Sequence, residues 1–173
     1  EAFFSAREPV ALLRVPGTAP KGLRLLAPES VKKLGYPDPV RGAAGEAQWF
    51  TQETAEGHVT CVYAAMRRVG DETLIATTVT FSPADGKDVV GAARARVDAA
   101  LAEGYAKVHA AHAAWWKSFW ATSAVNVPDA EVMRHYYLVE YFYGAASRVG
   151  APPIPLQGVW TADAGELPPW KGD

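Results

Sequence analysis

The sequence predicts an α+β chain in which an antiparallel β-sheet comes first and helices follow. Two observations lead to this fold class. Before Ser82, short runs rich in apolar and β-branched residues alternate with turn signals made of Gly and Pro. After Pro83 the apolar residues recur with a helical period near 3.6 instead of a period of 2. Because strands and helices are segregated along the chain, we expect two domains joined by a helical linker and no alternating βαβ units.

The first strands follow from apolar runs with clear ends. Residues 9–15 form such a run, which stops at the turn signal Pro16-Gly17. Residues 28–46 contain too many Pro and Gly residues for a long regular element. Further strands are expected at 47–53, 59–66 and 72–81, with a hairpin turn at Glu56-Gly57. Their spacing is typical of the end of an antiparallel sandwich or meander, whose sheet we expect to begin before Glu1.

Two helices are expected in the second half. Residues 88–120 are rich in alanine and carry apolar residues at helical spacing, which predicts one long helix; Gly91 and Gly104 are candidates for a bend or a break in it. The second helix begins after Asp129, a residue that caps helices well, and runs to Arg148. Gly150 is a suitable C-cap, and the prolines that follow it prevent continuation.

Composition excludes several classes of function. The 17 basic and 19 acidic residues give a net charge of −2 without a basic stripe, so neither nucleic acid nor a membrane surface is expected as a partner. No run approaches the roughly 20 apolar residues that a membrane span needs. The single cysteine, Cys61, lies in an apolar alternating run and is interpreted as a small buried residue. No zinc-like spacing is present, and we expect neither metal nor cofactor.

Aromatic residues are the outstanding compositional feature, since five of the six tryptophans lie after residue 100. The first helix ends in a cluster of four aromatic rings at helical spacing, and the second helix carries five: Trp115, Trp116, Phe119 and Trp120, then Tyr136, Tyr137, Tyr141, Phe142 and Tyr143. Rings at such spacings share a helix face. Packing in a core or interface is the main interpretation, and stacking against a sugar is the alternative.

Polar residues on the helices give weaker signals. His109 and His112 lie three residues apart, so a metal pair is conceivable, but no third ligand accompanies them and a structural role is preferred. Glu140 lies among aromatic residues and is interpreted as a partly buried structural carboxylate, with a catalytic acid as the alternative. His58, in the predicted turn, and His135, on the second helix, have no visible partner.

The segment after the second helix holds the candidate binding residues. Gln157 offers an amide that can both donate to and accept from sugar hydroxyls, while Trp160 and Trp170 offer flat apolar faces suited to pyranose rings. The alternative is that both tryptophans fix the loop onto the helices. Because no cap or apolar run follows Asp173, we expect the 173 residues to be a piece of a longer protein.

The second half of the chain resembles the start of the catalytic domain in six-hairpin glycosidases. The residues that carry the resemblance are Ala114-Trp115-Trp116-Lys117-Ser118-Phe119-Trp120, Val127-Pro128-Asp129, Tyr136-Tyr137-Leu138 with Tyr141, Ala145-Ala146-Ser147-Arg148, Leu156-Gln157-Gly158-Val159-Trp160 and Pro168-Pro169-Trp170. The pattern is most similar to glycoside hydrolase family 95, the α-L-fucosidases and related α-L-galactosidases, and covers residues 100–173. The doubled Trp115-Trp116 and the insertion at 161–166 depart from the fucosidases and leave fucose in doubt as the sugar.

The resemblance implies a fold and an activity. Residues 1–82 would be a partial N-terminal β-sandwich, 83–127 a helical linker, and 128–173 the truncated start of an (α/α)6 catalytic barrel. The parent protein would be an inverting glycoside hydrolase in which a glutamic acid protonates the leaving oxygen and asparagines position water. Those catalytic residues would lie beyond Asp173, so the fragment alone is expected to be inactive. Its substrate-binding residues would be Gln157, Trp160, Trp170 and Asp173.

The expected partners are a carbohydrate substrate and the remainder of the barrel. Export to the periplasm or outside the cell follows only by analogy. A non-catalytic carbohydrate-binding module is an alternative, although the long helical half argues against it. A structural or interaction domain is another, in which the aromatic residues form an interface. A phosphorylase with the same type of barrel is an enzymatic variant.

Overall fold

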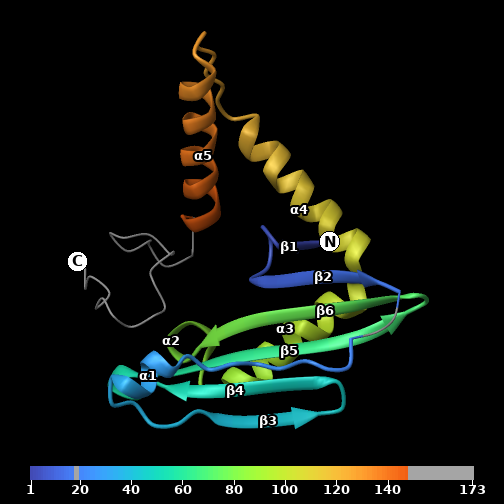
Figure 1. Ribbon diagram of the computed structural model, residues 1–173, viewed down its shortest axis with the longest axis vertical. Coiled ribbons are helices and arrows are strands. Elements are labelled where there is room, and N and C mark those ends of the chain that lie inside the picture. Colours follow the sequence, from blue (N-terminus) through green and yellow to red (C-terminus); the bar gives the residue numbers. More distant parts are fainter. Residues whose placement is uncertain (18–19, 148–173) are drawn as a thin grey trace. The chain divides into compact units, whose positions relative to one another are not determined.

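The computed structural model describes residues 1–17 and 20–147, which form an antiparallel sheet followed by helices (Figure 1). The α+β class is therefore as predicted. The chain divides into two compact units, Glu1–Ala114 and Trp115–Asp173. The first unit contains the sheet and its covering helix, and the second contains the described part of an aromatic helix pair. The finer division at residues 82 and 127 stays a prediction.

The described sheet has six strands, and every neighbouring pair is antiparallel. The strands are β1 (Ala2–Phe4), β2 (Val10–Pro16), β3 (Val40–Ala44), β4 (Ala47–Glu53), β5 (Val59–Val69) and β6 (Glu72–Phe81). Their order across the sheet is β1-β2-β6-β5-β4-β3. The four strands predicted from apolar runs are confirmed, and the predicted turn between β4 and β5 contains the short 3-10 helix η1 (Ala55–Gly57). β1 and β3 were not predicted.

One face of the sheet packs against α3 (Val89–Glu103). Strand residues alternate between the two faces, so every second residue of the central strands points at this helix. The sheet contributes the buried residues Leu12, Tyr63 and Ala76. The helix contributes Ala93 and Val97, which are fully buried. These residues belong to the main hydrophobic core of the described chain, which lies between the sheet and α3 and also includes Val108 from the following helix.

The other face of the sheet is crossed by the segment between β2 and β3, which includes α1 (Glu29–Lys33) (Figure 1). Arg41, on this face, donates to the Leu25 carbonyl at 2.9 Å, and the Gln52 amide donates to the Pro37 carbonyl at 2.9 Å. The expectation that residues 28–46 hold no long element is confirmed. Among the described residues this face meets a loop segment and no second sheet.

The single helix predicted over 88–120 is wrong, because the chain forms two helices there. α3 ends at Glu103, and α4 (Tyr105–Trp120) begins after Gly104. Gly104 has φ +83° and ψ 158°, a conformation that only glycine adopts readily. Gly104 therefore ends one helix and starts the next. Gly91, the other suspected break, lies inside α3 and does not interrupt the helix.

The second predicted helix is confirmed as α5 (Ala130–Ala146). The Asp129 side chain caps it by accepting hydrogen bonds from the Glu131 and Val132 amides, as expected for an acidic N-cap. The helix ends two residues before Arg148, with Ser147 at its C-cap. The predicted cap Gly150 lies outside the described residues.

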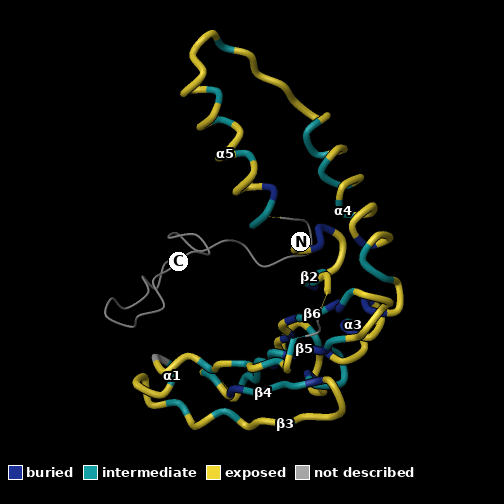
Figure 2. Tube along the Cα trace, turned by 45° about the vertical axis from the view of Figure 1, so that its right-hand side comes forward, coloured by how far each residue is buried: buried dark blue, intermediate teal, exposed yellow. Residues whose placement is uncertain are grey.

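The described part of the second unit is an aromatic hairpin. The end of α4 and α5 meet through ring contacts: Trp116 stacks on Tyr141 with centroids 5.3 Å apart, and Trp120 contacts Tyr137 at 5.8 Å. Gly144 allows close approach, since a Cβ there would lie 2.8 Å from the Phe119 ring. The packing interpretation therefore holds for these rings. Figure 2 shows that most of α5 is nevertheless exposed in the described part of the chain.

His112 fastens the first half of α4 to the start of the sheet. Its Nδ1 accepts a hydrogen bond from the Ala6 amide at 3.1 Å, and its ring lies against Phe3 with centroids 4.8 Å apart. Phe3 also contacts Tyr105 and His109. The structural role expected for the two histidines is thus found, with Nδ1 of His112 occupied as a hydrogen-bond acceptor.

Replacing His112 with alanine is expected to lower the free energy of unfolding by about 1–3 kcal/mol, because it removes the acceptor for the buried Ala6 amide. Urea denaturation followed by circular dichroism would measure this loss. His112→Asn is the matched control, because the asparagine oxygen can occupy the place of Nδ1 and restore much of the stability. Equal losses in the two variants would contradict the role of the hydrogen bond.

A charged pair joins α2 (Ser82–Asp85) to α3. The Arg96 guanidinium lies 2.7 Å from the Asp85 carboxylate, and both side chains are about one-fifth exposed. The Phe81 amide donates to the other carboxylate oxygen at 2.9 Å. Partial burial alone would raise the pKa of Asp85. The Phe81 hydrogen bond and the Arg96 charge outweigh burial and hold this pKa below its ordinary value of 3.8.

Because the pKa of Asp85 is lowered by folding, its stabilising contribution is present above pH 3.8 and is lost as the pH falls through its folded-state pKa. We therefore expect Asp85→Asn to be less stable than the wild type at neutral pH and to lose less additional stability on acidification. Urea midpoints at neutral pH and below pH 3.8 would measure both effects. Parallel acid profiles for the two proteins would contradict this prediction.

Candidate functional site

The binding residues expected from the sequence, Gln157, Trp160, Trp170 and Asp173, lie outside the described residues, as do the Leu-Gln-Gly-x-Trp and Pro-Pro-Trp motifs. Their assignment to sugar binding stays a prediction. Within the described residues, a pocket and several polar side chains come together in the first unit.

Cys61 belongs to the core. Its side chain is fully buried, and burial raises the pKa of the thiol to about 11, although a hydrogen bond with Thr80 opposes the shift. A buried thiol with a raised pKa is a poor nucleophile near neutral pH. The interpretation of Cys61 as a buried small residue is confirmed.

The remaining polar candidates have local roles. Within residues 1–17 and 20–147, no three or more His, Cys, Asp and Glu side chains gather as a metal site would require. His58 lies 3.5 Å from the Glu56 carboxylate in the turn after β4, and His135 Nδ1 lies 2.9 Å from the Glu131 carbonyl one helical turn away. Glu140 is half-buried on α5, as expected. These contacts are within single turns or loops.

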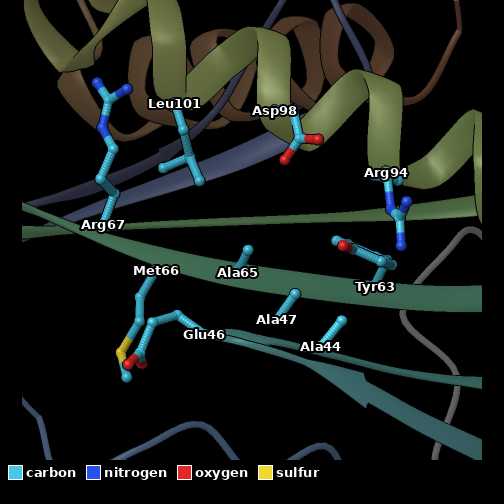
Figure 3. Close-up of a pocket in the computed structure, with 10 residues that line it drawn as sticks. All are labelled: Ala44, Glu46, Ala47, Tyr63, Ala65, Met66, Arg67, Arg94, Asp98 and Leu101. Atoms are coloured by element: carbon cyan, nitrogen blue, oxygen red, sulfur yellow. The ribbon is translucent and has the colours of Figure 1, made fainter.

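A pocket of about 510 Å³ opens between α3 and the β3-β4-β5 end of the sheet (Figure 3). Its origin is the cross-strand register. Ala44 pairs with Ala47, and Ala47 pairs with Ala65, so in this row three adjacent strands present only methyl groups toward α3. Because these side chains are short, they leave space beneath α3, which the larger neighbouring side chains keep at a distance from the sheet. This volume lies within the 300–1,000 Å³ that is usual for small-molecule sites.

Larger side chains from the next row and from the helix wall this pocket. Tyr63 lies two residues before Ala65 and stacks on Trp49, with ring centroids 5.6 Å apart and planes 13° apart. Leu101 of α3 lies above the alanine floor. Gly42 makes the stack possible, because a Cβ there would lie 2.3 Å from the Trp49 ring. The pocket wall is thus fixed by packing inside the first unit.

The Tyr63 hydroxyl opens into the pocket. The residue as a whole is only 2% exposed, and the hydroxyl has no hydrogen-bond partner among the described residues. No fully buried polar side-chain atom in the described part of the chain lacks a partner, so this hydroxyl must reach solvent through the pocket. Figure 3 shows it directed into the space below α3.

Four charged residues line the pocket: Arg94 and Asp98 from α3, Arg67 from β5, and Glu46 from the β3–β4 turn, whose side chain lies beside Met66 and is directed away from α3. All four are exposed. Among the residues that the structure describes, none of them forms an ion pair with another charged group. On the α3 side the rim therefore presents two guanidinium groups and one carboxylate, which together supply hydrogen-bond donors and acceptors.

Sequence reasoning missed this pocket because it depends on pairing register. The three alanines are separated by turns and strands, and their alignment appears only when Ala47 is placed between Ala44 and Ala65. The i, i+4 spacing of Arg94 and Asp98 was readable, but such a pair usually marks a solvated helix face. No single motif indicates the pocket.

Comparisons of the chain with protein families, with curated proteins and with solved structures gave no match. The structure adds one finding on membranes: no helix within the described ranges combines the length and apolar character that crossing a bilayer requires.

Proposed function

We propose that this chain is the junction segment of a glycoside hydrolase. In this proposal the antiparallel sheet belongs to an N-terminal β-sandwich, α3 and α4 form the linker, and α5 is the first helix of an (α/α)6 barrel. Bonds in oligosaccharides or polysaccharides would be hydrolysed with inversion. The catalytic residues would follow Asp173, and Gln157, Trp160, Trp170 and Asp173 would contact the substrate.

The observation that carries the proposal is the apolar surface of α5. Its exposed large apolar residues are Val132, Tyr137, Leu138, Val139, Tyr141, Phe142 and Tyr143. Consecutive residues on a helix are about 100° apart, so the runs 137–139 and 141–143 cover roughly two thirds of the circumference of α5. An apolar helix surface of this width is normally buried. An inner helix of a helical barrel has such surroundings, since neighbouring helices and the barrel interior cover it.

The order of elements also supports the proposal. An antiparallel sheet, a pair of helices separated at Gly104 and an aromatic hairpin follow one another as the sandwich, linker and barrel start would. The loop segment across the second sheet face leaves Val79, Phe81 and Phe4 exposed. In a sandwich, a second sheet would cover apolar residues of this kind.

The reading frame beyond Asp173 gives the first test. An Asn-x-Asn motif followed by further helical hairpins is expected there. A stop codon directly after Asp173, or a continuation without helical repeats, would overturn the proposal. The second test is hydrolysis of a panel of nitrophenyl glycosides by the intact gene product, with the anomer of the released sugar followed by proton NMR.

Trp170→Ala in the intact gene product is expected to lower kcat/KM without changing the circular dichroism spectrum. Val69→Ala is the control, because Val69 is an exposed apolar residue at the end of β5 and not on the face that a second sheet would cover, and its truncation should leave turnover unchanged. Phosphate-dependent turnover would replace the hydrolase with a phosphorylase.

A structural or interaction domain is the second candidate, because the same apolar face of α5 would suit another protein. In that case the intact gene product would hydrolyse no glycoside, and Trp170→Ala would alter only association with a partner. The two functions are thus separated by the same pair of assays.

A further inference from the structure

We propose that the pocket between α3 and the β3-β4-β5 end of the sheet binds the pyranose ring of a neutral sugar. The site lies entirely within Glu1–Ala114 and uses no catalytic group. It therefore goes beyond the proposed function and can hold even where the hydrolase proposal fails. Its ligand class follows from the floor, the Tyr63 hydroxyl and the donors and acceptor on the rim.

The floor suits the C–H face of a sugar ring. Ala44, Ala47 and Ala65 offer three methyl groups side by side, and Leu101 closes the pocket from the helix. This surface gives apolar contact but no hydrogen bonds. A ligand that buries one apolar face here and keeps polar groups at its periphery satisfies both the floor and the rim, whereas a fully apolar ligand would strip water from the charged rim without replacing its hydrogen bonds.

The Tyr63 hydroxyl supplies a built polar contact. It belongs to a side chain held by the Trp49 stack, points into the pocket, and has no partner among the described residues. A phenol can donate one hydrogen bond and accept others, so it complements a hydroxyl of either orientation. Because its ring is already fixed, binding would immobilise few additional torsions.

The rim on the α3 side offers both donors and an acceptor of hydrogen bonds. Arg67 and Arg94 donate, and the Asp98 carboxylate accepts. The hydroxyls of a neutral polyol can use both kinds of group, because each donates and accepts. They can donate to the carboxylate and accept from the guanidinium groups, whose planar forks match two neighbouring oxygens.

Binding is tested by isothermal titration of the purified protein that carries this chain with D-galactose, L-fucose, D-glucose and D-xylose. At least one sugar is expected to bind with a millimolar dissociation constant, which is reasonable for a small open site. Tyr63→Phe removes only the hydroxyl and is expected to weaken binding by about threefold to tenfold, the effect of one hydrogen bond. Asp98→Asn is also expected to weaken binding of the same sugar.

Tyr137→Phe and Arg134→Ala, both on α5, are the matched controls and should leave binding unchanged. Circular dichroism and thermal unfolding establish that each variant is folded. The proposal is overturned if no sugar in the panel binds to the folded wild type. It is equally overturned if Tyr63→Phe and Asp98→Asn leave the isotherm unaltered, because the sugar then occupies another site, such as a catalytic cleft. Binding of acetate or phosphate in preference to every sugar would also contradict it.

Weaker sugar binding in Tyr63→Phe with unchanged glycoside hydrolysis would support the pocket as a separate subsite. Hydrolysis that fails in the wild type while Tyr63-dependent sugar binding persists would reject the proposed function and keep the pocket. The two proposals therefore fail independently.

Discussion

Replacing Leu12 with alanine is expected to lower the free energy of unfolding by about 2–5 kcal/mol. Leu12 is fully buried on β2, pairs with Ala76 on β6, and belongs to the core that α3 covers. Alanine would leave a cavity that the small neighbour Ala76 cannot fill. Domains are commonly stable by only about 5–15 kcal/mol, so this single change would remove a large share of the total.

Urea denaturation monitored by far-ultraviolet circular dichroism would measure the loss. Leu26→Ala is the matched control, because Leu26 is 66% exposed and its truncation should change stability by less than about 0.5 kcal/mol. Similar midpoints for the two variants would show that the sheet and α3 do not form the cooperative core described above.

The second large effect is expected at Gly42. A Cβ at this position would lie 2.3 Å from two carbons of the Trp49 ring, which is far closer than atoms can approach. Gly42→Ala must therefore displace the ring from its stack on Tyr63, and forced repacking of this kind costs about 1–3 kcal/mol. Because Tyr63 walls the pocket, the same variant should also weaken sugar binding there.

A double-mutant cycle separates the clash from other effects of the substitution. In a Trp49→Ala background the added methyl meets no ring, so Gly42→Ala should cost much less than in the wild type. Ala43→Val, on the neighbouring exposed position of β3, serves as the control for a larger side chain on the same strand. An unchanged cost of Gly42→Ala in the two backgrounds would contradict the steric explanation.

Local chemistry made the long strands readable from the sequence. β6 spans the predicted residues 72–81 because β-branched residues alternate there between a buried and a half-exposed face. β3 was missed because its Val-Arg-Gly-Ala-Ala sequence has little β-propensity, and it exists because it pairs with β4 and accommodates the Trp49 ring at Gly42. β1 has three residues, too few to show a period.

Helix ends could be predicted where a capping residue marks them in the sequence. Asp129 was identified because a carboxylate before an apolar helical pattern satisfies free amides, and the structure has those hydrogen bonds. The separation at Gly104 was only suspected, because glycine is tolerated inside helices, as Gly91 is in α3. Contact of Phe3 with Tyr105 and His112, distant in sequence, could not be read from the helix itself.

The candidate sites also differ in how far the sequence predicts them. Aromatic packing of Trp116 and Trp120 followed from helical spacing and needed only a neighbouring helix. The pocket required knowledge of which alanines align across three strands, and register is a tertiary property that no single segment encodes.

The positive φ of Gly104 allows α3 and α4 to unfold locally as separate helices. Amides of Gly104 and Val108 still bond to carbonyls four residues earlier, yet the reversed backbone prevents α3 and α4 from propagating as one helix. α3 carries five buried residues against the sheet, whereas α4 has only Val108 fully buried within the described chain. Amide hydrogens of α4 should therefore exchange with deuterium through local fraying, whereas those of α3 should exchange only when the sheet unfolds.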